Sequence, residues 1–98
     1  MNILILGSGI VGANLANKLS EQGKDVFLLD DDPKELKRLS ESYDIKTILD
    51  DPLNPNFYIN FKTDIDYFIA VTKSDEKNII TCKFAKEFLK VDKTIARI

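Results

Sequence analysis

The chain has 98 residues, a net charge of −2 and a hydrophobic fraction of 44%. This length suits one domain over residues 1–98, and the charge offers no basic surface for nucleic acid. No apolar run reaches the roughly 20 residues of a membrane span, and the N-terminus does not resemble a signal peptide. One cysteine and no histidine exclude an intramolecular disulfide, a histidine-ligated metal site and imidazole catalysis within the chain. These features fit a cytoplasmic domain without direct membrane insertion.

Residues 2–12 combine an apolar run with three closely spaced glycines. Ile3–Leu6 is rich in branched side chains, which is typical of a strand buried on both faces. Gly7, Gly9 and Gly12 follow at G-x-G-x-x-G spacing. In that pattern the first glycine permits a sharp turn, the second lets the backbone approach a pyrophosphate, and the third lets a helix pack closely. The glycines alone are weak evidence, because a turn of this composition can also bind nothing.

A helical apolar pattern begins directly after the turn. At 100° per residue, one arc of this helix holds Val11, Gly12, Leu15, Ala16 and Leu19. We expect this arc to face the sheet. The free N–H groups of the first helical turn, together with the helix dipole, then favour an anion over the second glycine.

The next strand, residues 26–29, ends at Asp30, about 20 residues beyond the glycines. An acidic residue at this position accepts hydrogen bonds from the adenosine ribose in dinucleotide-binding domains. Asp31 is a weaker candidate, since a solvated acidic loop also explains it. Because Asp30–Asp32 would repel a ribose 2′-phosphate and no arginine stands nearby to receive it, we expect NAD or an adenine nucleotide to bind better than NADP.

A short amphipathic helix is predicted after these aspartates. Asp32 is expected to be its N-cap, Pro33 its first residue and Glu35 the capping-box partner. The apolar positions that repeat along it are Leu36, Leu39 and Tyr43.

The third strand, residues 45–49, alternates apolar and polar side chains, which is typical of an edge strand. Asp50 and Asp51 follow it. They either reach the adenine side of a ligand or form a polar surface turn, and the sequence favours neither interpretation. A short helical segment is predicted around residues 56–61.

The C-terminal third predicts a strand at residues 66–72, a helix over residues 75–89 and a strand at residues 94–98. Thr72 and Lys73 either line the central crevice or belong to the helix cap. The apolar residues of the helix are Ile80, Cys82, Phe84, Ala85, Phe88 and Leu89. They cover roughly 200°, more than one sheet contact needs, which implies a second contact with a partner chain or with further sequence.

Strands and helices alternate along the whole chain, which requires a parallel sheet with right-handed crossovers. We predict a Rossmann-like, doubly wound α/β fold with strand order 3-2-1-4-5, truncated before a sixth strand. A ligand then binds beyond the carboxyl ends of the first and fourth strands. The predicted cofactor-binding residues are Gly7, Ser8, Gly9, Ile10, Val11, Gly12, Asp30, Asp31, Asp50, Asp51, Thr72 and Lys73.

Four segments together resemble the RCK (regulator of K+ conductance) or KTN nucleotide-binding domain, in particular the TrkA-type subunits of potassium uptake systems. They are Gly7–Gly12, Val26–Asp32 with its terminal Asp-x-Asp, Ala70–Asn78 and Ile95–Ile98. The third is similar to the family pattern Ala-Val-Thr-x-x-Asp-Glu-x-Asn, which is more specific than the glycines. The resemblance covers essentially the whole chain.

The chain departs from this family at two points. The family usually has Gly-Asp-Ala-Thr after the third strand, whereas here Asp50 replaces the glycine and only Asp51 carries over. We expect a charged Asp50 beside the adenine to alter or weaken binding. The family domain also usually continues through a sixth strand and helix, so we expect a truncated or shortened relative.

The resemblance implies a non-enzymatic regulatory module that binds NAD or NADH, or ATP/ADP, and gates potassium transport through nucleotide-dependent assembly. It implies a homodimer or higher oligomer and a membrane potassium transporter or channel subunit as partner, with the chain peripheral on the inner face of the membrane. Two alternatives remain open. The first is that the chain is the cofactor-binding half of an NAD-dependent oxidoreductase. The second is that it is a degenerate fold that serves assembly only.

Overall fold

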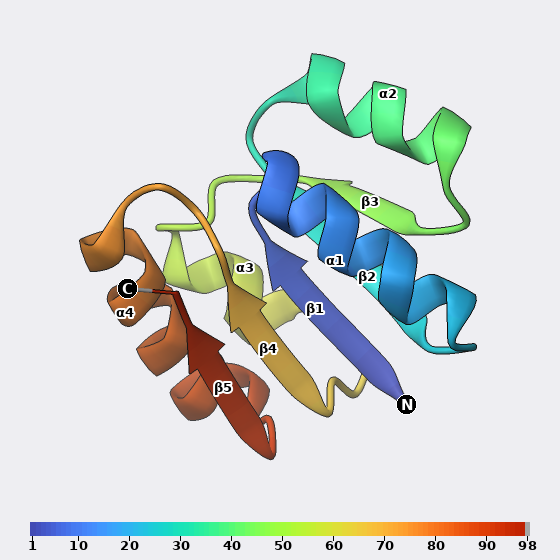
Figure 1. The fold of residues 1–98 in the computed structure, drawn as a ribbon. Helices are drawn as coiled ribbons and strands as arrows, with labels where there is room; N and C mark the ends of the chain where they lie inside the picture. The colour runs from blue at the N-terminus through green and yellow to red at the C-terminus, as the bar shows by residue number, and fades with distance from the viewer. Residues whose placement is uncertain (98) are drawn as a thin grey trace.

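The computed structural model describes residues 1–97. Over these residues the chain forms a five-stranded parallel sheet in the order β3-β2-β1-β4-β5, flanked by helices (Figure 1). The strands are β1 (Asn2–Leu6), β2 (Asp25–Asp30), β3 (Lys46–Leu49), β4 (Tyr67–Ala70) and β5 (Lys93–Ala96). The helices are α1 (Ile10–Glu21), α2 (Pro33–Ser42), α3 (Pro55–Asn60) and α4 (Asp75–Phe84), and α4 continues as a π-helical turn, η1 (Ala85–Leu89). The Rossmann-like fold and its strand order are confirmed; Ile98, predicted in the fifth strand, lies outside the described residues.

Two apolar layers enclose the sheet. Residues of β1 alternate between them, because successive side chains of a strand point to opposite faces. Ile3 and Ile5 pack with α1 and α2, whereas Leu4 and Leu6 pack with α3, α4 and η1. Figure 1 shows the same division, with α1 in front of the sheet and α3 and α4 behind it. Burial on both faces explains why the run is continuously apolar.

Helix α1 approaches the sheet through its smallest residues. Gly12, Ala13 and Ala16 are its buried positions, and a Cβ added at Gly12 would overlap the carbonyl oxygen of Gly7. Gly7 itself has φ +116°, a conformation that other residues rarely adopt. The expectation that Val11 faces the sheet is wrong, since Val11 is 42% exposed. Val11 lies in the first turn of α1, where it borders a cleft and not the sheet.

Helix α2 begins as predicted, but its capping box is absent. The Asp32 side chain accepts hydrogen bonds from the backbone N–H groups of Lys34 (3.1 Å) and Glu35 (3.4 Å), and Pro33 opens the helix. The prediction that Glu35 bonds back to the Asp32 N–H is wrong. That N–H donates to Asp30 instead (3.1 Å), which leaves the Glu35 carboxylate free for another partner.

The apolar arc predicted for the last helix is divided by the π-helical turn. Cys82 and Ala85 are buried, whereas Ile80 and Phe88 are 43% and 38% exposed. The wider turn at η1 rotates the residues after Phe84 away from regular α-helical spacing. The exposed strip is therefore narrower than the sequence implies, and a second contact for it stays a prediction.

Because α1 approaches the Gly7 turn so closely at Gly12, we predict that a side chain at this position lowers the free energy of unfolding. Gly12→Ala forces α1 away from the Gly7 turn, so we expect a loss of about 1–3 kcal/mol or more in the free energy of unfolding. Gly9→Ala is the control, because a Cβ there meets nothing within 4 Å. Its cost should stay below about 1 kcal/mol, as for an ordinary change at a helix N-cap. Urea unfolding followed by circular dichroism compares the two, and equal midpoints would contradict the packing constraint.

Candidate functional site

A cleft of about 770 Å³ opens at the carboxyl edge of the sheet, beside the point where the strand order reverses. Its walls come from the β1–α1 turn, from the end of β2 with the first turns of α2, and from the segment that follows β4. The predicted residues that line it are Gly7, Ser8, Gly9, Ile10, Val11, Asp30, Asp31, Thr72 and Lys73. Most of the predicted set is thus brought together in one place.

Three predicted residues lie elsewhere. Gly12 is beneath the turn, where it shapes the cleft without lining it. Asp50 borders a separate hollow of about 350 Å³ beside α3. The Asp51 carboxylate accepts a hydrogen bond from the Leu53 N–H (3.0 Å), so it closes its own turn. Neither aspartate lines the larger cleft, and their contact with a ligand stays a prediction.

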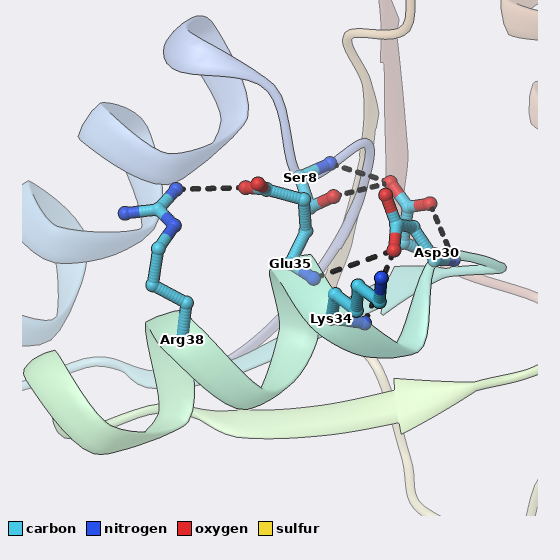
Figure 2. A network of polar contacts seen from close by, with 6 residues as sticks. Ser8, Asp30, Lys34, Glu35 and Arg38 are labelled. Atoms are coloured by element: carbon cyan, nitrogen blue, oxygen red, sulfur yellow. Dashed lines mark hydrogen bonds and ion pairs between the residues drawn. The ribbon is translucent and has the colours of Figure 1, made fainter.

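The Asp30 carboxylate joins the end of β2 to the glycine turn (Figure 2). Its Oδ2 accepts hydrogen bonds from the Ser8 N–H and the Ser8 hydroxyl, both at 2.7 Å. Its Oδ1 accepts from the N–H groups of Asp31 (2.8 Å) and Asp32 (3.1 Å). A carboxylate offers about four lone-pair sites, so these four donors occupy it fully.

These contacts keep Asp30 ionised. Burial raises the pKa of this carboxyl, but the hydrogen bonds from the Ser8 side chain and backbone and from Asp32 lower it more. The net result is a pKa below the ordinary value. At neutral pH the cleft therefore carries a fixed negative charge and strong hydrogen-bond acceptors at its β2 side.

The N-terminus of α1 presents unpaired backbone donors to the same cleft. Gly9 is the N-cap and offers no side-chain hydrogen bond, and no acidic residue occupies the first turn. The first N–H groups of a helix have no partner within it, and the helix dipole adds a partial positive charge there. This part of the cleft is suited to an anion such as a phosphate.

Asn78 is a residue whose role the sequence did not indicate. It is fully buried on α4, and its Oδ1 accepts hydrogen bonds from the Thr72 N–H (3.0 Å) and hydroxyl (2.7 Å). Its Nδ2 donates to the carbonyl oxygens of Thr72 (3.1 Å) and Arg97 (2.9 Å). Asn78 thus joins the ends of β4 and β5. An asparagine on the buried side of an amphipathic helix is the signal that marks such a role.

Basic side chains also line the cleft. Lys73, Lys77 and Arg97 lie on its β4–β5 side, and Arg38 of α2 lies on the opposite side with Asp30. The expectation of no arginine near the aspartates is therefore wrong. Arg38 is one helical turn beyond Glu35, and the helix brings it to the wall of the cleft.

Metal ligands, a reactive thiol and membrane-spanning helices would each indicate another kind of function. Among residues 1–97, no group of three or more His, Cys, Asp or Glu side chains is placed to hold a metal ion. Cys82 is buried, and burial raises the pKa of its thiol, which disfavours the reactive thiolate. Within the same residues, no helix has both the length and the apolar content that crossing a bilayer requires. In the cleft, the Asp30 carboxylate lies beside the N-terminus of α1, whose N–H groups can donate to an anion.

Known proteins are similar to this chain in sequence and in fold. The Trk system potassium uptake protein TrkA of Haemophilus influenzae is 34% identical over 99 residues, which cover 100% of this chain and 22% of that protein. A TrkA homolog 2 of Methanosarcina mazei is also 34% identical, over 100% of this chain and 23% of that protein. The chain therefore spans less than a quarter of the length of these relatives.

A solved structure supports the fold independently. The NAD(P)-binding domain of an exopolyphosphatase-related protein from Archaeoglobus fulgidus superimposes with a TM-score of 0.83 at 20% identity, over 95% of this chain and 70% of that one. The family model described as the TrkA-N domain matches residues 3–98. The chain accordingly belongs to the TrkA-N domain family.

Proposed function

We propose that the chain binds an adenine dinucleotide, NAD or NADH, in the cleft at the carboxyl edge of the sheet. The observation that carries the proposal is the position of the ionised Asp30 carboxylate beside the uncapped N-terminus of α1. NAD has two riboses, whose hydroxyl groups need acceptors, and one pyrophosphate, whose oxygens need donors. In this proposal the adenosine ribose lies at Asp30 and the pyrophosphate lies over Gly9.

Binding of the ribose requires one local rearrangement. The four lone-pair sites of Asp30 already have donors, so a ribose hydroxyl must replace one of them. The Ser8 hydroxyl is the group that moves most easily, since rotation about one bond turns it away. The three backbone donors then hold the carboxylate in place while it accepts the ribose. Asp30 is in this way preorganised for the ligand.

The same relatives suggest the larger setting. Proteins named Trk system potassium uptake protein TrkA match the whole chain, so we propose that it serves as a regulatory module of potassium uptake. The module would act in the cytoplasm, as a homodimer or higher oligomer, on the inner face of a membrane transporter or channel subunit. To pass its nucleotide-bound state to the transporter, the module must bind the nucleotide with different affinities in two assembly states. ATP or ADP is an alternative ligand, because it shares the adenosine and the phosphates.

This proposal describes a binding protein and not an enzyme. On the β2 side of the cleft, backbone N–H groups hold the Asp30 carboxylate, and Glu35 holds Arg38. A dehydrogenase would need a substrate-binding part and an acid–base pair beside the cofactor. Turnover of NAD with candidate alcohols or acids would favour the oxidoreductase alternative.

Gly9 offers a test of the phosphate position that leaves the fold intact. A methyl group at Gly9 has open space around it in the free protein but occupies the place of the pyrophosphate. We expect Gly9→Ala to weaken NAD binding at least tenfold, which is about 1.4 kcal/mol, in isothermal titration calorimetry. Asn14→Ala is the control, as an exposed residue of α1 outside the cleft. Unchanged affinity in Gly9→Ala, or no binding of NAD, NADH, ATP or ADP by the parent chain, would contradict the proposal.

The lowered pKa of Asp30 predicts a pH-dependent contribution to stability. Its folded pKa is below the unfolded value of about 3.9, so the stabilisation is complete above that pH and is lost as the pH falls through the folded pKa. Asp30→Asn should therefore unfold at a lower temperature than the parent at pH 6 to 7. The difference between the two should shrink below a pH of about 4. Melting curves across this range measure it, and a pH-independent difference would contradict the ionic role.

A further inference from the structure

The cleft is electrostatically divided across β1. Its β2 side carries Asp30, Asp31 and Glu35 with one cation, Arg38, whereas Lys73, Lys77 and Arg97 lie on its β4–β5 side. A dinucleotide with its adenosine ribose at Asp30 places the ribose 2′ position on the acidic side. The charges of this side therefore decide whether the cleft accepts a phosphate at the 2′ position.

Arg38 is the side chain that a 2′-phosphate would need. A phosphate monoester carries about −1.5 to −2 charges at pH 7, and arginine binds it with two parallel hydrogen bonds. Within residues 1–97, Arg38 is the single cation that lines the cleft on the side of Asp30. The Arg38 guanidinium, however, already has a partner, because its Nη2 donates to Glu35 Oε2 at 2.7 Å.

Glu35 is directed at Arg38. Figure 2 shows its carboxylate extending toward the guanidinium and away from Asp30. This orientation follows from the start of α2, where Asp30 has taken the N–H that a capping-box glutamate would accept from. If Arg38 turned to a phosphate, Glu35 would lose its cation and would join Asp30 and Asp31 as a third negative charge on this side of the cleft. Glu35 thus withholds the arginine and cancels its positive charge.

We propose that Glu35, by holding Arg38, determines that this cleft prefers NAD over NADP. The inference rests on the proposed function, because it concerns the same cleft and the same orientation of the dinucleotide. It assigns a specificity role to two residues of α2 that lie outside the glycine turn. Asp30–Asp32 repel a 2′-phosphate, and Glu35 neutralises Arg38, the cation that would offset this repulsion.

The test is calorimetric titration of NAD and NADP into the parent and into Glu35→Gln. Removal of the Glu35 charge frees Arg38 and removes one repulsion, so NADP should bind about tenfold more tightly than to the parent. NAD affinity should change by less than about threefold, since NAD has no group at the 2′ position that needs Arg38. The gain for NADP should decrease as salt is raised, because both groups are exposed. Where the heat of direct binding is small, displacement of bound NAD by NADP gives the ratio of the two affinities.

Three further variants make the outcome specific. The double variant Glu35→Gln with Arg38→Gln should lose the gain, since the arginine is then absent. Glu41→Gln removes the same charge from an exposed position of α2 that does not line the cleft, and it should leave NADP binding unchanged. Glu35→Ala should reproduce Glu35→Gln. Melting curves check that each variant is folded.

The possible failures are distinguishable. If the parent binds NAD but Glu35→Gln binds NADP no more tightly than the parent, this inference is wrong and the proposed function stands. An equal gain in Glu41→Gln would also overturn it, since net charge would then explain the effect. If the parent binds neither dinucleotide, the proposed function and this inference fail together.

Discussion

The absence of a side chain at Gly12 is the constraint on which the cleft depends. Any Cβ there would overlap the Gly7 carbonyl, so only glycine lets α1 begin directly above the end of β1. That position directs the first N–H groups of α1 into the cleft. It also holds Ser8 close enough to the end of β2 to donate to Asp30 twice. A local packing requirement thereby places the donors and the acceptor of the proposed nucleotide site.

Hydrogen bonds between strand ends give the cleft its remaining shape. Asp30 joins the end of β2 to the turn after β1, and Asn78 joins the ends of β4 and β5. Both residues are held by several partners, as a preorganised site requires. The strands they connect lie on opposite sides of β1. If a nucleotide binds in the cleft as proposed, a nucleotide-dependent change in assembly would have to act through these contacts.

The sequence predicted the fold and the glycine turn because both depend on local patterns. Continuous apolar runs, glycine spacing and Asp32 as a cap are properties of neighbouring residues, and the structure agrees with them. Glu35 and Arg38 were misjudged because Asp30 took the capping contact. Asp30 lies only two residues before the cap, but Ser8, 22 residues away, holds its carboxylate in place. Asn78 was missed for a similar reason, since its partners include a residue 19 positions away. Interactions between distant segments decide which polar groups remain available, and periodicity does not report them.

Backbone amide spectra of ¹⁵N-labelled protein during titration with NAD test the central claim most directly. If the dinucleotide binds over the N-terminus of α1, the largest shifts should fall on the amides of Ser8 to Val11, with further shifts at Asp31 and Thr72. These amides lie in the turn, at the end of β2 and after β4, which together line the cleft. Absence of shifts at millimolar NAD, or shifts confined to the hollow beside α3, would contradict the account.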